Sequence, residues 1–421
     1  MKAITAIILA AGEGARMRSH RQKALHEICG RSLLEWAFSA CEGNVMDPPI
    51  VVTGFDGESV RAHVGGRARL VAQTQSGSIA EGVMRALPEI GNRNGYVLVL
   101  HGNLPLLSSR TVGMLADAAE GVAASRLVFC EEDEETRTCP GYCFDLGRLR
   151  RSMEQGLPHD VTAEYYIRAL RMAGERVIDV YAPAEECTPV SDRASLWECT
   201  YLMQRAINAR HMEQGVTFID PTQAYIDEDV RIGEDTLIYP GVILQGHTRI
   251  GRGCTIYNGC RLKDTIVGDG CELAAVVAQE AAVEDGVSVG PYVRLRPNAH
   301  LGKGCKVGNF VEIKNSTLGE GGKVAHLTYV GDADIGKRIN VGCGTAFANY
   351  DGAYKHRTTI GDDVFLGCNT ALVAPVRLGD RAYTAAGSTI TKDIPEGQLG
   401  VARARQTNIA GWQPPKKDGK R

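Results

Sequence analysis

The sequence predicts an α/β, Rossmann-like first part followed by an all-β parallel β-helix of hexapeptide repeats. Three observations carry this prediction. An aliphatic residue returns every six positions from Ile226 onward, glycine becomes much more frequent after residue 215, and apolar strands alternate with amphipathic helices before it. A chain of 421 residues also exceeds one ordinary core, so two domains are expected.

The repeat is regular enough to define the fold of the second part. Three hexapeptides make a coil of about 18 residues, and each flat segment turns one aliphatic side chain inward. The register later slips and resumes as pairs such as Val289–Gly290 and Leu301–Gly302. An antiparallel sandwich would need a period of two instead. The long flat faces of such a prism can pair with copies of themselves, so a closed homo-oligomer is expected. The first lattice positions are Ile226, Ile232, Ile238, Leu244, Ile250, Ile256 and Leu262.

Composition narrows the class of partner and the compartment. A net charge of -3 and a pI near 6.4 give no reason to expect nucleic acid or a membrane surface, so small charged metabolites are the expected partners. Thirteen cysteines, an odd number, predict free thiols in a reducing, cytoplasmic setting. The apolar start of the chain is followed by a glycine loop rather than a cleavage site, which favours a buried strand over a signal peptide.

The first part begins with a strand and a glycine loop. An apolar run from Ala3 to Ala10 precedes Gly12, Gly14, Arg16 and Lys23. Glycines let backbone N–H groups approach phosphate oxygens while basic residues offset charge, but an ordinary βα turn fits these residues equally well.

Further strands and helices alternate along the first part, which predicts a parallel sheet. At the end of one of these strands, 101–106 reads HGNLPL, at an edge where such sheets bind ligands. A long amphipathic helix is expected from Arg193 to Gln214. The expected strands are 49–53, 96–101, 126–130 and 176–181, and the expected helices are 33–41 and 78–87.

Several motifs together resemble one bacterial family. They are LAAGEGARM with Lys23, HGNLPLL, GYCFD, the run 190–220, and almost all of the second half. The chain resembles the bifunctional N-acetylglucosamine-1-phosphate uridylyltransferase / glucosamine-1-phosphate N-acetyltransferase, closely after residue 215 and more loosely before it.

This resemblance implies a nucleotide-sugar-transferase-like first domain and a trimeric, left-handed β-helix acetyltransferase. The implied domains are a degenerate nucleotidyltransferase-like domain at 1–192, a helical linker at 193–214, the β-helix at 215–402 and a C-terminal extension at 403–421. The implied nucleotide-binding residues are Leu9, Gly12, Arg16, Lys23, Gly77 and Asn103.

The first half departs from the family at several motifs. The family has L-G-T-G, G-D-x-P and G-V-N-D-R where this chain has SGSI, GNLP and PVSDR. The family's Mg²⁺ ligands thereby become Asn103 and Ser191, and a neutral amide is a poorer ligand for Mg²⁺ than a carboxylate. The segment between Cys130 and Gly141, which holds the sugar in the family, is also short. No metal site is therefore expected, uridylyl transfer is expected to be lost or weak, and Mg²⁺ is required only if this domain is active.

The stretch that begins at Arg294 matches the acetyltransferase half nearly residue for residue. An amine must lose a proton while it attacks a thioester, and His326 suits the role of general base because its ordinary pKa is near neutrality. A sugar phosphate needs cationic partners. The loop 349–357 interrupts the repeat and is expected to carry Lys355 to a neighbouring subunit. By resemblance the sugar-phosphate residues are Arg296, Lys314, Tyr329, Asn340 and Lys355.

Acetyl-CoA is the co-substrate that the resemblance implies. Cys343 and Cys368 stand where the family usually has Ala and Ser, and direct transfer needs no covalent nucleophile, although a cysteine could supply one. The acetyl-CoA positions are Cys343, Asn349, Tyr350, Cys368, Ala386 and Arg403.

The expected function is N-acetylation of glucosamine 1-phosphate on the way to UDP-N-acetylglucosamine. Two alternatives stay open: a fully bifunctional enzyme, and a scaffold or metabolite sensor that has kept the fold. Another amino-sugar phosphate is also a possible acceptor.

Overall fold

The computed structural model describes residues 3–73, 79–91, 93–130, 135–154 and 162–413. The chain divides into two compact units, Met1–Ala209 with Ile226–Glu228, and Arg210–Tyr225 with Asp229–Arg421. None of the helices in the described ranges is long and apolar enough to cross a membrane.

The first unit is a seven-stranded sheet in the order β5-β4-β1-β6-β8-β7-β9. Its strands are β1 (Ile4–Ala10), β4 (Ile50–Thr53), β5 (Arg69–Ala72), β6 (Tyr96–His101), β7 (Ala124–Cys130), β8 (Thr136–Asp145) and β9 (Val177–Tyr181). A small hairpin, β2 (Glu27–Ile28) with β3 (Arg31–Ser32), stands apart from it.

Helices cover both faces of this sheet, as the alternating inward and outward side chains of buried strands require. Ile8 of β1 packs with α1 and α4 on one face, whereas Ile7 packs with α3 and α6 on the other. The helix α1 begins at a capping box of Ser32 and Glu35. The helices are α1 (Leu33–Cys41), α2 (Gly57–Val64), α3 (Ile79–Ile90), α4 (Ser109–Ala118), α5 (Leu146–Glu154), α6 (Ala163–Met172) and α7 (Arg193–Glu213).

The expected strands and helices of the first unit are confirmed, but the wholly parallel sheet is wrong. β8 runs antiparallel to both β6 and β7. Only a short connection joins β7 to β8, and a parallel pair would need a crossover of a dozen or more residues.

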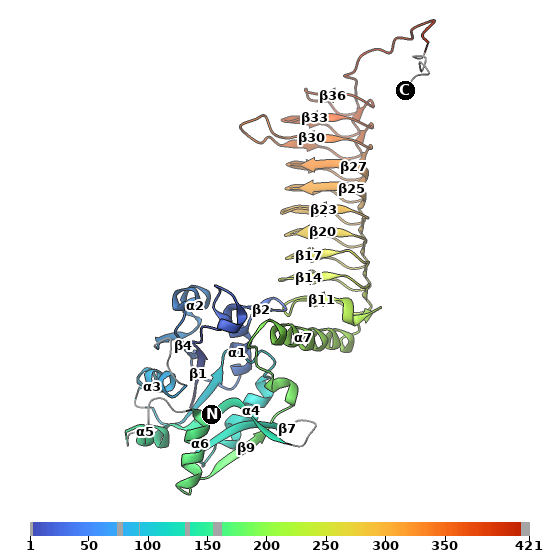
Figure 1. Ribbon diagram of the computed structural model, residues 1–421. Helices are drawn as coiled ribbons and strands as arrows, with labels where there is room; N and C mark the ends of the chain where they lie inside the picture. Colours follow the sequence, from blue (N-terminus) through green and yellow to red (C-terminus); the bar gives the residue numbers. More distant parts are fainter. Residues whose placement is uncertain (1–2, 74–78, 92, 131–134, 155–161, 414–421) are drawn as a thin grey trace, which may run out of the picture. The chain divides into compact units, whose positions relative to one another are not determined.

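The second unit is a parallel β-helix whose strands stack in chain order (Figure 1). Ile232 pairs with Ile250 and Ile238 with Ile256, which confirms the spacing of 18 residues. Parallel sheets of hexapeptide repeats make this a left-handed β-helix, as expected. One face is formed by β12 (Arg231–Ile232), β15 (Arg249–Ile250), β18 (Ile266–Val267), β21 (Ala282–Val283), β24 (Ala299–Leu301), β26 (Ser316–Leu318), β28 (Ala333–Ile335), β31 (Thr358–Ile360) and β34 (Val376–Leu378).

The other two faces form one continuous sheet, because β25 and β27 turn the corner between them without a break. The second face has β10 (Thr217–Phe218), β13 (Leu237–Ile238), β16 (Thr255–Ile256), β19 (Glu272–Leu273), β22 (Ser288–Val289), β25 (Lys306–Lys314), β27 (Lys323–Gly331), β29 (Asn340–Val341), β32 (Phe365–Leu366), β35 (Tyr383–Thr384) and β37 (Leu399–Gly400). The third has β11 (Tyr225–Ile226), β14 (Ile243–Gln245), β17 (Arg261–Lys263), β20 (Val276–Gln279), β23 (Val293–Leu295), β30 (Ala346–Ala348), β33 (Ala371–Val373) and β36 (Thr389–Ile390).

The fixed phase of glycine has a steric cause. A Cβ on Gly319 would lie 2.5 Å from the backbone carbonyl of Gly336, and one on Gly336 would lie 2.6 Å from that of Gly361. Side chains larger than a hydrogen atom would therefore push successive coils apart at this corner.

Candidate functional site

Basic side chains gather beside β25 in the β-helix. Lys314 ends this strand and contacts Lys355, which comes from the loop between β30 and β31 of the same chain. The Lys355 ammonium group lowers the pKa of Lys314, with smaller contributions from desolvation and from Arg296. Arg296 is held in turn by Glu312, with Nη1 donating to Oε1 at 2.9 Å. Cations brought this close together are suited to a multiply charged anion such as a phosphate.

The buried carboxylate of Asp332 lies close to this cluster. Asp332 accepts hydrogen bonds from the Asn315 amide at 2.5 Å and from the Asn349 amide, and it opposes the lowering of the Lys314 pKa. Asn349 is also 3.5 Å from the Tyr329 hydroxyl. Asn349, expected at acetyl-CoA, therefore lies with Tyr329, expected at the sugar phosphate.

His326 lies on β27 and is exposed. Its Nδ1 is 3.2 Å from Oδ1 of Asn309, its partner in the register of β25 and β27. A carbonyl oxygen only accepts, so this contact requires the hydrogen on Nδ1 and, in the neutral ring, leaves the lone pair on Nε2. The basic nitrogen of the imidazole, Nε2, therefore lies on the side of the ring away from Asn309.

A corner separates His326 from the basic cluster. Leu327 adopts a left-handed backbone conformation with φ 43°, and Phe310 does so on the coil below with φ 59°. Leu327 thus turns β27 between His326 and Tyr329. Asn340 is paired with Lys323 at the start of β27, on the same side of the corner as His326.

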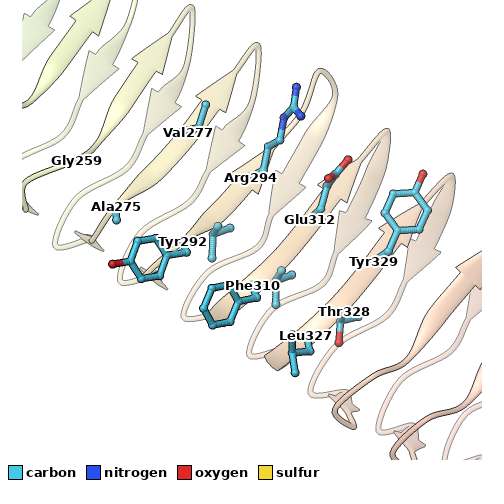
Figure 2. A pocket seen from close by; sticks show the side chains of 12 residues that line it. Gly259, Ala275, Val277, Tyr292, Arg294, Phe310, Glu312, Leu327, Thr328 and Tyr329 are labelled. Carbon is cyan, nitrogen blue, oxygen red and sulfur yellow. The ribbon is translucent and has the colours of Figure 1, made fainter.

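An apolar groove of about 810 Å³ follows this corner (Figure 2). Tyr292, Phe310 and Leu327 lie along it with 65%, 56% and 58% of their surfaces exposed. In the strand register of the third face, Arg294 is the partner of Glu312, and Glu312 is the partner of Tyr329. The groove is lined by Gly259, Ala275, Val277, Tyr292, Val293, Arg294, Phe310, Val311, Glu312, Leu327, Thr328 and Tyr329.

Most of the residues expected at acetyl-CoA form a ladder on the last coils. Cys343 and Cys368 follow the paired strands β29 and β32 by the same number of residues, and Ala386 follows β35 likewise. Arg403 is tied to this ladder because its Nη1 donates to the Ala386 carbonyl at 2.8 Å. Tyr350 lies instead on the protruding loop, where its hydroxyl donates to the Gly352 carbonyl at 2.6 Å.

The first unit has its own pocket, of about 230 Å³, at the carboxyl ends of β1 and β6. In the sheet, β4 and β5 lie on one side of β1 and β6 lies on the other. The pocket is therefore at the switch point at which such sheets bind ligands. Four of the six expected residues meet here: Leu9, Gly12, Lys23 and Asn103.

Two basic groups give this pocket its electrostatic character. Burial, and then the charge of Arg16, lowers the pKa of Lys23, so exposed Arg16 lies near the pocket although it does not line it. Burial and Lys23 together lower the pKa of His101 to about 4. His101 is therefore neutral near neutral pH. Gly77 lies outside the described residues.

Asn103 and Ser191, which stand in the expected place of the Mg²⁺ ligands, are both uncharged. The Asn103 amide donates to the Val190 carbonyl at 2.8 Å, and the Val190 N–H donates back to the Asn103 carbonyl. The Ser191 backbone N–H donates to the Ser195 hydroxyl at 2.9 Å, and the two hydroxyl oxygens are 3.5 Å apart. Neutral oxygens are weaker ligands for Mg²⁺ than carboxylate oxygens.

The sequence alone did not point to Asn309, Glu312, Asp332 and Asn315. Each supports a predicted residue rather than being one. Asn309 lies 17 residues before His326, which is one short coil of the β-helix, and this spacing could have indicated the contact. Because the repeat changes register in this region, the sequence did not show which residues stack.

Comparisons with known proteins match both units. The MobA-like NTP transferase domain family matches residues 6–188, and the bacterial transferase hexapeptide (six repeats) family matches 229–264, 281–315 and 357–392. The bifunctional protein GlmU of Listeria welshimeri is 38% identical over 441 residues, covering 96% of each chain. That of Thermoanaerobacter pseudethanolicus is 39% identical over 451 residues, covering 98% of each. With this identity over nearly its whole length, the chain belongs to the bifunctional GlmU family.

Proposed function

We propose that this chain transfers the acetyl group of acetyl-CoA to the amine of glucosamine 1-phosphate, giving N-acetylglucosamine 1-phosphate for UDP-N-acetylglucosamine synthesis. The observation that carries the proposal is the gathering of Arg296, Lys314 and Lys355 beside β25, the strand that pairs with β27, on which the imidazole of His326 lies. The cations bind the phosphate dianion, and Nε2 of His326 takes the proton that the amine loses as it attacks the thioester carbonyl. The CoA thiolate then leaves.

The direct test is release of free CoA thiol from acetyl-CoA in the presence of glucosamine 1-phosphate. His326→Ala is expected to lower kcat by roughly a hundredfold or more, because the base is lost. His300→Ala is the matched control, since His300 is paired with Glu284 elsewhere on the prism. An unchanged rate in His326→Ala would exclude His326 as the base.

We further propose that the site is completed by neighbouring copies in a homotrimer. A corner separates His326 from Lys314, and an exposed apolar groove runs along that corner. A second chain in the groove would bring its own residues to a substrate held between prisms. Lys355 contacts Lys314 of its own chain, so this proposal does not depend on Lys355 crossing to a neighbour.

For the first unit, we propose that uridylyl transfer is lost or greatly weakened. The proposal rests on Asn103 and Ser191, which offer neutral oxygens where the reaction needs anionic oxygen. The test is pyrophosphate release from UTP, Mg²⁺ and N-acetylglucosamine 1-phosphate. Turnover at an ordinary enzymatic rate, about 1 per second or faster, would overturn it.

A further inference from the structure

Cys343 and Cys368 occupy equivalent places on successive coils of the β-helix. Val341 of β29 pairs with Leu366 of β32, and each cysteine lies two residues beyond its strand. The stacking continues past the strands, because the Asn369 N–H donates to the Cys343 carbonyl at 2.7 Å. The two cysteines therefore belong to one column of stacked residues.

The spacing of stacked coils suits a bond between these side chains. Neighbouring parallel strands lie about 4.8 Å apart. Disulfides join Cα atoms that are about 4.4 to 6.8 Å apart. Cys343 is half-buried and Cys368 is exposed, so a small oxidant reaches both.

The other cysteines make this pair distinctive. All thirteen lie in the described part of the chain, and nine of them are buried. Of the four that are not, Cys29 and Cys130 lie in the first unit. The accessible thiols of the β-helix are thus Cys343 and Cys368, which are stacked on each other. Accessible thiols beside a resolving thiol are the ones that oxidise selectively.

We propose that Cys343 and Cys368 form a reversible dithiol–disulfide couple that peroxides oxidise and that governs use of the acyl donor. The Cys368 thiolate attacks the peroxide O–O bond, giving a sulfenic acid and hydroxide (or an alkoxide from an alkyl peroxide), which takes up the proton that the Cys368 thiol lost and leaves as water (or an alcohol). The Cys343 thiolate then attacks the sulfenic sulfur, forming the S–S bond and displacing hydroxide, which takes up the proton that the Cys343 thiol lost and leaves as water. Two thiols lose two electrons in total, and the peroxide gains them.

The position of this couple links oxidation to catalysis, and this link rests on the proposed function. The same column continues to Ala386, whose carbonyl holds Arg403. A disulfide would fix the two coils together along the edge expected to receive acetyl-CoA. Exposed disulfides are also readily reduced, so thiol reductants should restore the dithiol.

The experiment treats the full-length protein with hydrogen peroxide, blocks remaining thiols with an alkylating agent and maps linked peptides by mass spectrometry. The expected result is a Cys343–Cys368 cross-link, two hydrogens lighter than the free peptides, which dithiothreitol removes. It should persist in Cys130→Ser and be absent from Cys343→Ala and Cys368→Ser. Absence of the cross-link from protein in which Cys130 is oxidised would overturn the proposal.

The rate of CoA release is measured on the same samples, each variant being compared with its own reduced form. Oxidation should lower the rate at least tenfold in the parent and in Cys130→Ser, and less than twofold in the Cys343→Ala/Cys368→Ser double variant. A cross-link without loss of rate would overturn the regulatory half. If the reduced parent has no acetyltransferase activity, the proposed function and the control of it by oxidation both fail, whereas the mapping still decides the couple.

Discussion

At the scale of single residues, Asn309 is the partner that gives His326 its direction. Replacing it with alanine leaves Nδ1 without its acceptor, so the imidazole can rotate or carry its hydrogen on the wrong nitrogen. We expect Asn309→Ala to lower kcat by roughly ten- to a hundredfold, as loss of an orienting partner commonly does, with KM for both substrates little changed. Steady-state kinetics of CoA release measure both constants.

A conservative variant separates orientation from folding. In Asn309→Asp the carboxylate still accepts from Nδ1–H, so kcat should recover most of the loss seen with alanine. Asn94→Ala, at an exposed asparagine of the first unit, should leave both constants unchanged. Equal losses in Asn309→Asp and Asn309→Ala would show that Asn309 does not act through the imidazole.

The basic cluster makes binding of the sugar phosphate depend on pH. Lys355 lowers the pKa of Lys314, so Lys314 loses its charge at a lower pH than an isolated lysine does. The protonated form binds phosphate, and KM for the sugar phosphate should therefore rise as pH increases through this lowered pKa. Lys355→Gln should raise KM about tenfold near neutral pH, through loss of a charge-assisted hydrogen bond. It should also move the rise to higher pH, because removing the neighbouring cation raises the pKa of Lys314.

The control for this pH profile is Lys337→Gln, which removes an exposed lysine of the same prism. Its KM curve should coincide with that of the parent. A rise at the same pH in parent and Lys355→Gln would mean that the two ammonium groups are not coupled.

At the scale of elements, the glycine column holds the coils at their spacing. Gly319→Ala places a methyl group against the Gly336 backbone, which has no flexible end to move aside. We expect a loss of about 1 to 3 kcal/mol, as other overpacked sites show. It should appear as a lower Tm for the β-helix in calorimetry. Gly66→Ala, where a Cβ meets open space, should leave the Tm unchanged. The same Tm for Gly319→Ala would contradict a steric role.

The elements also show how far the sequence could reach. A six-residue aliphatic period predicts the β-helix because each repeat contains its own inward-facing aliphatic residue, so the pattern is visible in any short stretch of the sequence. β8 was not among the predicted strands, so the antiparallel direction that the short connection after β7 imposes on it was not recognised. Likewise His326 and Lys314 could be named from motifs, but the hydrogen bond to Asn309 and the contact with Lys355 depend on which coils stack. The local sequence pattern therefore predicts helices and strands, whereas the register of the strands determines which side chains contact one another.

At the scale of the whole molecule, the apolar groove should be covered by a second copy. Val277 is 48% exposed in the groove, and it pairs with Arg261 and Arg294 on either side. Because the side chain at this position is half exposed in the single chain, the coil itself tolerates Val277→Asp. A desolvated carboxylate facing another chain is costly. Light scattering after size exclusion should therefore show a trimer for the parent and a monomer for the variant.

Activity should fall with assembly even though Val277 is distant from the reacting groups. The chain of pairs from Val277 through Arg294 and Glu312 to Tyr329 spans three coils, or about 14 Å. We expect CoA release by Val277→Asp to fall at least tenfold, since a site completed between prisms is lost when they separate. Tyr181→Asp, at an exposed residue of the first unit, should change neither mass nor rate. A monomeric Val277→Asp with full activity would mean that each prism holds a complete site, and His326 and Lys314 of one chain would then have to reach the same substrate around the corner.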